Sequence, residues 1–497
     1  MAQPDQWNRS KGRQTMYDSD GDTTYSIGSF FSGSDSDGDN DGSPNDIMAK
    51  FVHKTKQKEK EKEKEQKNMK SIEEERAGYI TRGLSGFKNI GNTCYMNSTL
   101  QCICHVSMFI SVLLNPTHYT KISNNTEMNI IRKLGKRKRE CEGIGKDTQI
   151  NLNLSEIESE MASTITHQLK KLLDGYWKIN CTITPVNLKK TIGEHNKEFR
   201  DFGQKDSQEL LNLILNNIHE ETNVKEFENI KMKHMPKSII GLNRIKKHCD
   251  AVVKSPTSSI DQKSRVIKMY HTYRDKYMDD VIRWNAYKYW EKHVKRGYSP
   301  ITQLFSGLHY EIVQCNTCKK ISSTFALFNT LSIEINQCKE TTLEDCLKNF
   351  SYGEILQNDE QYSCSACKKK VNATKTIFIW EPPEICIIAF KRFKNDGNMQ
   401  WKIMEKVIFP INGLELTDNY SDIHQPEEKC IYDLCGVINH TGSLNFGHYT
   451  AYCKNPLNKL WYEFDDDDIF HVPKHKLENE IVTKNAYVLF YERRREA

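Results

Sequence analysis

Cys94 has the surroundings of a reactive thiol, because it stands where a Gly/Asn-rich loop turns into an apolar stretch. Asn92 and Thr93 are typical helix-capping residues, so we expect a helix that begins at or beside Cys94. The positive end of that helix and its unpaired N–H groups favour the thiolate, the nucleophilic form of cysteine. Cys94 is therefore a candidate nucleophile. The alternative is a small buried cysteine at a helix start.

His448 is the best candidate for the base that such a nucleophile needs. It follows a glycine at the start of an alternating stretch, HYTAY, and a second stretch, LWYEF, ends at Asp465. If the two stretches pair as a hairpin, Asp465 orients the imidazole while His448 faces the thiol, as in papain-like enzymes. A surface histidine beside an acidic turn is the alternative. Three other histidines compete for the role without a comparable strand start: His440, His471 and His475.

Four cysteines form two Cys-x-x-Cys pairs, Cys315 with Cys318 and Cys364 with Cys367. Two such turns can present four thiolates tetrahedrally, the usual arrangement of structural zinc. The pairs are separated by residues 319–363, so the site would join two distant hairpins. Two independent reduced pairs or a redox motif are the alternatives. Four cysteine ligands leave no open position on the metal, so we expect structural zinc and no catalytic cofactor.

The elements that position these residues change type along the chain. An apolar period near 3.6 residues predicts one continuous helix from the cysteine through residue 114, and further helices are expected over residues 156–176 and 205–221. From residue 301 onward, short β-branched and aromatic runs predict strands. The fold class is therefore α+β, with a helical lobe against a sheet lobe.

Composition narrows the functional classes. The 497 residues carry a net charge of +5, which does not indicate nucleic-acid or membrane binding. There is no apolar run near the ~18 residues of a membrane span and no signal-peptide core. We expect a monomer in the cytoplasm or nucleus, with its 16 cysteines mostly reduced. The basic run at residues 135–140 is interpreted as a solvated loop, or less readily as a nuclear-import patch.

Two segments, residues 1–82 and 222–298, differ in composition from the rest of the chain. Residues 1–82 are rich in Ser, Asp and Gly and then in Lys and Glu, which predicts a disordered tail. Residues 222–298 are charged and helical in pattern, and we interpret them as an insertion in a domain covering residues 83–495.

Together these motifs resemble the ubiquitin-specific proteases, a family of papain-like deubiquitinases. The segment from Gly86 to Gln101 is similar to the family's cysteine box, and residues 447–452 with 461–466 are similar to its histidine box. The resemblance implies Cys94 as nucleophile, His448 as base and Asp465 as orienting acid. It also implies that Asp466 supports the site and that Asn89 supplies an oxyanion-hole donor.

Further stretches agree with this resemblance. GQKDSQELL resembles the box that holds the tail of ubiquitin, which implies Gln204 and Asp206 as substrate-binding residues, and Gly447 and Tyr449 would line the same channel. The cysteine pairs fall where the family's fingers bind zinc. The chain departs from the family pattern at three positions: Lys205, Leu210 and Phe446.

The resemblance implies a helical thumb, a β palm and zinc-bearing β fingers around ubiquitin. The expected activity is thiol hydrolysis after the C-terminal glycine of ubiquitin, with ubiquitin and ubiquitinated proteins as partners. A protease for a ubiquitin-like modifier and a catalytically inactive ubiquitin-binding scaffold are the alternatives. A zinc-organised nucleic-acid binder is disfavoured by the near-balanced charge.

Overall fold

The computed structural model describes residues 82–142, 152–224, 234–336, 341–395, 400–424, 429–443 and 446–495. Contacts divide the chain into Met1–Glu73 and Glu74–Ala497, and the described residues all belong to the second unit. The predicted tail therefore lies outside the described residues, apart from Arg82.

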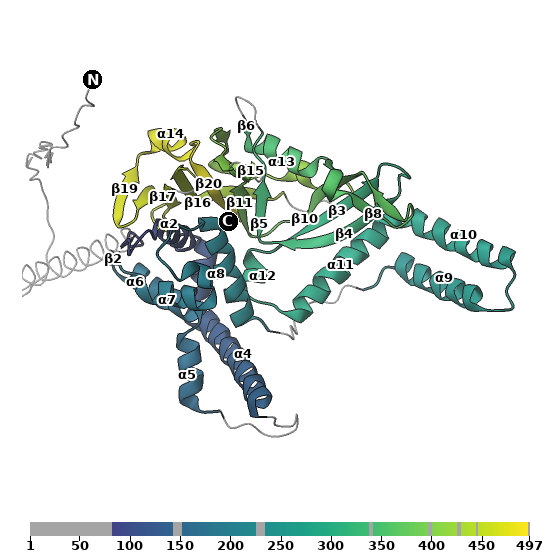
Figure 1. Cartoon of the computed structure of the whole chain (residues 1–497), viewed down its shortest axis with the longest axis horizontal. Coiled ribbons are helices and arrows are strands. Elements are labelled where there is room, and N and C mark those ends of the chain that lie inside the picture. Colours follow the sequence, from purple (N-terminus) through teal and green to yellow (C-terminus); the bar gives the residue numbers. More distant parts are fainter. Residues whose placement is uncertain are drawn as a thin grey trace, which may run out of the picture. The chain divides into compact units, whose positions relative to one another are not determined.

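Helices dominate the N-terminal half of the described chain and form the thumb (Figure 1). They are α2 (Cys94–Ile103), α3 (Ser107–Leu114), α4 (Pro116–Glu142), α5 (Leu154–Ala162), α6 (Ile165–Lys178), α7 (Val186–His195), α8 (Ser207–Thr222) and α12 (Pro300–Leu304). The short strands β1 (Gly86–Phe87) and β2 (Thr182–Ile183) pair in parallel beside them. All ten side chains of α2 are buried, so the helix that carries Cys94 lies at the centre of the fold.

The prediction of one continuous helix from the cysteine onward is wrong, because α2 and α3 meet at a bend of 81°. His105 lies in the break, where its Nδ1 is 2.8 Å from the carbonyl oxygen of Gln101 and its ring packs against Phe464. A side chain that bonds the last turn competes with continuation of the helix. Among the described helices, no single one has the length and apolar content to cross a membrane; the α2–α3 pair passes only when its two bent halves are joined.

Two further helix predictions need correction. The helix expected over residues 156–176 is two helices, because Thr164 caps the start of α6 with its hydroxyl. The basic run at residues 135–140 is not a loop but the last part of α4. Its cations pair with acids of α5: Arg137 lies 3.0 Å from Glu160, and Lys138 lies 3.0 Å from Glu156.

An eight-stranded sheet forms the palm, with the order β19-β18-β17-β16-β20-β11-β5 and with β15 paired to β16. Its strands are β5 (Thr330–Ile333), β11 (Ile385–Phe390), β15 (Asn412–Glu415), β16 (Ile431–Gly442), β17 (Gly447–Lys454), β18 (Trp461–Asp465), β19 (Asp468–Val472) and β20 (Ala486–Arg493). The alternation of side chains divides the core into two. On β20, Val488 and Phe490 pack toward the thumb helices, while Leu489 and Tyr491 pack on the other face.

The other face of the palm is closed by α13 (Leu343–Ser351) and α14 (Leu477–Ile481). Two short strand pairs complete this region: β6 (Thr341–Thr342) with β14 (Val407–Ile408), and β12 (Phe393–Asn395) with β13 (Gln400–Lys402). Arg392, fully buried, ties the region together by donating to the carbonyl oxygens of Ala486 and Ile403.

A second antiparallel sheet forms the fingers, in the order β4-β3-β10-β7, with a separate β8–β9 hairpin. Its elements are β3 (Gly307–Cys315), β4 (Ile321–Phe328), β7 (Glu354–Leu356), β8 (Tyr362–Cys364), β9 (Lys369–Val371) and β10 (Ala373–Glu381). This separation of sheets and helices confirms the α+β prediction with thumb, palm and fingers.

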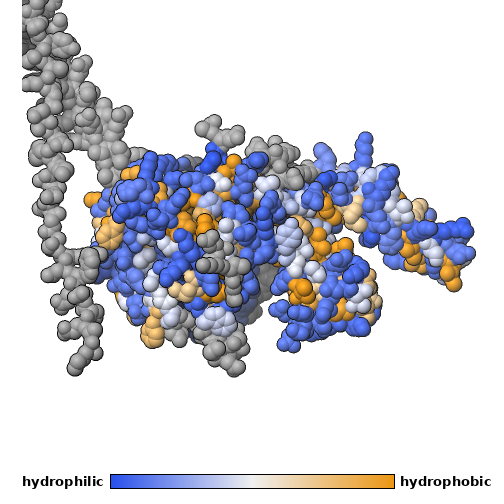
Figure 2. All heavy atoms as spheres, turned by 90° about the horizontal axis from the view of Figure 1, so that it is seen from above, coloured by the Kyte–Doolittle hydropathy of each residue, from blue (hydrophilic) through white to orange (hydrophobic). Residues whose placement is uncertain are grey.

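Within the charged region at residues 222–298, the described residues from 237 to 296 are mostly helical, as their pattern predicts. It contains α9 (Lys237–Lys254), α10 (Ile260–Lys276) and α11 (Met278–Arg296). α11 is integral to the fingers, because Ile282 and Ala286 pack with Phe325 and Trp380. α9 and α10 form a hairpin that projects from the fingers (Figure 1), and hydrophobic residues lie among hydrophilic ones on its surface (Figure 2). Ile260 and Met269 of α10 are exposed.

Candidate active site

Cys94 and His448 meet between the thumb and the palm. Cys94 is the first residue of α2 and is 4% exposed, and α2 packs directly on β17, which carries His448. A hydrogen bond with Cys94 is the largest of the effects that raise the pKa of His448 to about 9. An imidazole with such a pKa is protonated at neutral pH, so it can stabilise a thiolate and later donate a proton.

Asp465 holds the imidazole from the other side. It is the last residue of β18, and the antiparallel β17–β18 pairing returns it to His448, with its Oδ1 2.6 Å from the ring Nε2. The nitrogen left to serve Cys94 is therefore Nδ1. The side chains of His448 and Asp465 are 45% and 44% exposed, so solvent screens the pair. Its main effect is on the orientation and pKa of the ring.

Asn89 is held by the loop that precedes α2. Its Oδ1 accepts from the backbone N–H groups of Gly91 and Thr93 at 3.0 and 3.1 Å, and its Nδ2 donates to Asp466 Oδ2 at 2.9 Å. Thr93 does not cap α2 with its side chain, because its hydroxyl accepts from Ile90 N–H instead. The carboxamide of Asn89 is thus fixed in the loop that leads into Cys94, with one N–H still available to a ligand.

Asp466 lies in the β18–β19 turn, and the turn packs closely on β1. Its φ of +54° is left-handed, a conformation that Asp tolerates better than most residues. Its carbonyl oxygen accepts from Phe87 N–H at 2.9 Å, and a Cβ at Gly86 would lie 2.4 Å from the carbonyl oxygen of Asp467. The turn and the loop before α2 are therefore one packed unit that carries both Asn89 and Asp466.

Sequence reasoning missed Asn97, whose Nδ2 lies 2.8 Å from Asp466 Oδ1. Asn97 is 1% exposed and comes from α2, three residues after Cys94. Residues three apart lie on the same side of a helix, so the spacing from Cys94 indicates that Asn97 shares its side of α2, but the sequence does not show that Asp466 is its partner.

A groove of about 550 Å³ is lined by three of the four predicted substrate-binding residues, Gln204, Asp206 and Tyr449. Gln204 spans it from the thumb: its Nε2 donates to Gly447 O at 2.9 Å, and its Oε1 accepts from Gly447 N–H at 3.0 Å. A Cβ at Gly447 would lie 2.1 Å from His440 Nε2, so no side chain fits there. Phe446, which departs from the family pattern, is 79% exposed at the rim.

Asp206 serves both the groove and α8. Its Oδ1 accepts from the N–H groups of Gln208 and Glu209, which caps α8, and burial raises its pKa. Its Oδ2 accepts from the hydroxyl of Tyr487 at 2.7 Å. Tyr487 was not predicted, because nothing in the local pattern of β20 distinguishes it from its neighbours.

The competing histidine nearest the site, His440, forms part of the groove wall. It is 3% exposed and packs its ring 4.6 Å from that of Tyr449, and burial lowers its pKa to about 4. It is therefore neutral at physiological pH. The structure places His448, and not His440, beside Cys94 and Asp465.

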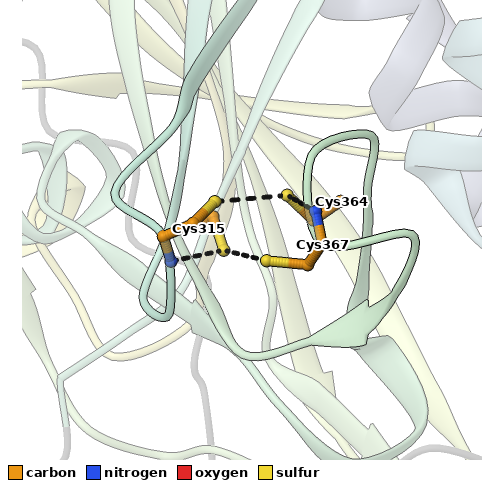
Figure 3. A group of neighbouring side chains, drawn as sticks. Cys315, Cys364 and Cys367 are labelled. Carbon is orange, nitrogen blue, oxygen red and sulfur yellow. Dashed lines mark hydrogen bonds between the residues drawn. The ribbon is translucent and has the colours of Figure 1, made fainter.

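The four cysteines of the two Cys-x-x-Cys pairs converge at the fingers (Figure 3). Each pair forms the turn of a hairpin, β3–β4 or β8–β9, and the four sulfur atoms lie within 4.8 Å of one another. Sγ of Cys315 is 3.9 Å from that of Cys367, and Sγ of Cys318 is 3.6 Å from that of Cys364. The group could hold a metal ion, and it is separate from the thiol, imidazole and carboxylate described above.

Comparison with known proteins assigns the family. The sequence model of the family described as ubiquitin carboxyl-terminal hydrolase matches residues 85–491, most of the chain. The chain belongs to this family. Ubiquitin carboxyl-terminal hydrolases of this kind are deubiquitinating enzymes of the cysteine-protease type, in agreement with the resemblance found in the sequence.

Relatives within the family of ubiquitin carboxyl-terminal hydrolases differ in length. The chain is 28% identical over 443 residues to a probable member from Acanthamoeba polyphaga mimivirus, covering 83% of this chain and 90% of that protein. It is 30% identical over 427 residues to ubiquitin carboxyl-terminal hydrolase 4 of Saccharomyces cerevisiae, covering 82% of this chain and 39% of the relative. It is 28% identical to Usp2 of Drosophila melanogaster, covering 86% of this chain and 36% of the relative. The chain thus spans less than half of the yeast and fly relatives.

The fold of the family is also found among solved structures. The SAGA Ubp8/Sgf11/Sus1/Sgf73 DUB module bound to ubiquitin aldehyde superposes with a TM-score of 0.52 at 20% identity, covering 84% of this chain and 71% of that chain. A likeness at this identity shows the hand-like fold of the ubiquitin carboxyl-terminal hydrolases and nothing finer.

Proposed function

We propose that this chain is an active thiol hydrolase that cleaves the isopeptide or peptide bond after the C-terminal glycine of ubiquitin. Its partners are then ubiquitin and ubiquitinated proteins. The observation that carries the proposal is the meeting of Cys94, His448 and Asp465, which come from α2, β17 and β18.

The geometry supports two chemical steps. In the first, the Cys94 thiolate attacks the carbonyl carbon of the terminal glycine, and His448 Nδ1 donates its proton to the leaving amine, which leaves a thioester. In the second, neutral His448 takes a proton from water as the water attacks the thioester, and Cys94 leaves as the thiolate, which restores the starting pair of thiolate and protonated imidazole. Asp465 keeps the ring oriented through both steps.

Asn89 is the proposed side-chain donor to the oxyanion that forms in each step. Its amide is held by four hydrogen bonds with Gly91, Thr93 and Asp466 before substrate arrives. A donor fixed in advance stabilises the developing charge without reorganising during the reaction.

We also propose that the four cysteines of the fingers bind structural zinc. Sulfur atoms bound tetrahedrally to zinc at about 2.3 Å lie roughly 3.8 Å apart, and the distances of 3.6 and 3.9 Å between sulfurs of the two pairs agree with this. In each pair the second cysteine's N–H donates to the first cysteine's Sγ at 3.4 Å, as suits a negatively charged sulfur. The zinc would join the β3–β4 and β8–β9 hairpins.

We also propose that the protein is located in the cytoplasm or nucleus. The described cysteines are all free thiols, which suits the reducing cytoplasm or nucleus.

The activity is tested with a fluorogenic substrate that carries an amine dye on the C-terminus of ubiquitin. Wild-type protein should release the dye, and Cys94→Ser should not, with unchanged folding as the control. The same dye attached to ubiquitin-like modifiers measures whether the protein prefers ubiquitin or one of these modifiers. Turnover only of a ubiquitin-like substrate would indicate the rival protease, and turnover of none would indicate an inactive scaffold.

A further inference from the structure

The carboxylate of Asp466 connects two asparagines from different parts of the site. Its Oδ2 accepts from Asn89 Nδ2 at 2.9 Å, and its Oδ1 accepts from Asn97 Nδ2 at 2.8 Å. Asn89 belongs to the loop before α2, whereas Asn97 lies inside α2 with 1% exposure. The chain Asn97–Asp466–Asn89 therefore links the helix that carries the nucleophile to the proposed oxyanion donor.

The orientation of the Asn97 amide is forced by its surroundings. Its Nδ2 faces two acceptors, Asp466 Oδ1 at 2.8 Å and Phe87 O at 3.1 Å. The reverse orientation would place an oxygen against both acceptors, so the donor must face them. The cost is visible on the other side, where Asn97 Oδ1 is buried and has no hydrogen-bond partner in the described structure. A buried polar atom without a partner is rare and calls for an explanation.

We propose that Asn97 is a positioning residue for the oxyanion donor. It acts through Asp466, which in turn directs one N–H of Asn89 so that the other points at the developing oxyanion. The inference rests on the proposed hydrolase activity and deepens it. Because Asn97 lies on the helix of Cys94, three residues along, the link through Asp466 fixes the oxyanion donor relative to the element that carries the sulfur.

This assignment predicts a specific kinetic signature for Asn97→Ala. The Asn89 amide loses its fixed direction, so kcat should fall by about 10- to 100-fold, the scale of a misplaced catalytic group. KM should change little, because Asn97 does not line the groove. The rate at which iodoacetamide alkylates Cys94 should also stay the same, because that reaction forms no oxyanion. Ser98→Ala is the matched control: Ser98 is buried in the same helix but its hydroxyl bonds only to Tyr95 O.

A double-mutant cycle separates positioning from a general structural role. In an Asn89→Ala background, Asn97→Ala should cost less than about twofold in kcat, since its target is already gone. A full additive loss in that background, or unchanged kcat in the single variant, would overturn the inference. So would a parallel loss of alkylation rate. If Asn97→Ala does not fold, Asp466→Ala cuts the same link from the exposed turn and should show the same non-additivity.

The outcome is distinguishable from failure of the proposed activity. If wild-type protein hydrolyses no ubiquitin or ubiquitin-like substrate, the proposed function fails. If wild type is active but the Asn97 and Asp466 variants behave additively with Asn89→Ala, only this inference fails.

Discussion

At the scale of residues, a few side chains define the site, and their types were readable from the sequence. Cys94 and His448 stand in recognisable local contexts, a helix start and a glycine-flanked strand start. Asn97 and Tyr487 were not found, because their roles depend on partners hundreds of positions away: Asp466 is 369 residues from Asn97, and Asp206 is 281 residues from Tyr487. Such contacts exist only once the chain is folded.

The raised pKa of His448 predicts the alkaline limit of activity. The proton that His448 must donate is present below its folded pKa and is lost as pH rises through about 9. The ratio kcat/KM, followed by a pH–rate profile with the amine-dye substrate, should therefore decline above that pH. In Asp465→Asn a carboxylate that raises the pKa is gone, so the decline should move to lower pH. An alkaline limb at the same pH in both proteins would contradict this electrostatic account.

Removal of the Asn89 carboxamide should affect turnover far more than folding. Asn89 is an exposed loop residue, so Asn89→Ala should leave the unfolding temperature nearly unchanged. Loss of one oxyanion donor lowers kcat by ~10²–10³. Steady-state kinetics beside thermal unfolding check both parts. A kcat close to wild type would remove Asn89 from the mechanism.

At the scale of elements, local pattern predicted helix positions better than helix ends. The apolar period continued smoothly through residue 114, yet the buried ring of His105 breaks the helix into α2 and α3. Likewise, the basic run at residues 135–140 is polar enough for a loop, but α5 supplies acids that pair with it in helical form. The second error comes from acids of α5 that a window around residues 135–140 does not contain, whereas the contact between His105 and Gln101 is local.

Asp206 offers a test of how one element supports the groove. Asp206→Ala removes the cap of α8 and should lower the free energy of unfolding by about 1 kcal/mol. Asp206→Asn keeps a capping oxygen, so its free energy of unfolding should fall by only a few tenths of this amount. Urea unfolding of the two variants measures the difference. Both should raise KM, because the buried charge beside the groove is absent in each, and equal stability of the two variants would show that the cap does not matter.

The fingers should depend on their four cysteines. Metal analysis of purified protein should find one zinc per chain, and Cys318→Ser should abolish it and lower the unfolding temperature. Cys181→Ser, which changes an exposed cysteine outside this group, is the matched control. Folded wild-type protein without bound metal would contradict the zinc proposal.

At the scale of the whole molecule, the palm sheet is the element on which the other parts pack. Its two faces are buried in separate cores, one shared with the thumb helices and one with α13 and α14. The resemblance of widely spaced motifs to a known family predicted this hand-like arrangement. Local patterns could not have predicted it, since they do not specify which helix packs on which strand. The α9–α10 hairpin shows the limit of that approach: its helices were predictable, but its projection from the fingers was not.

The central claim is that Cys94, of all the cysteines, is the one aligned with a groove for the tail of ubiquitin. A ubiquitin whose C-terminal glycine is replaced by an electrophile tests it directly, with peptide mass spectrometry to locate the adduct. One ubiquitin should be attached per chain, at Cys94, and denatured protein should not react. Attachment at another cysteine, or none to the folded protein, would contradict the account.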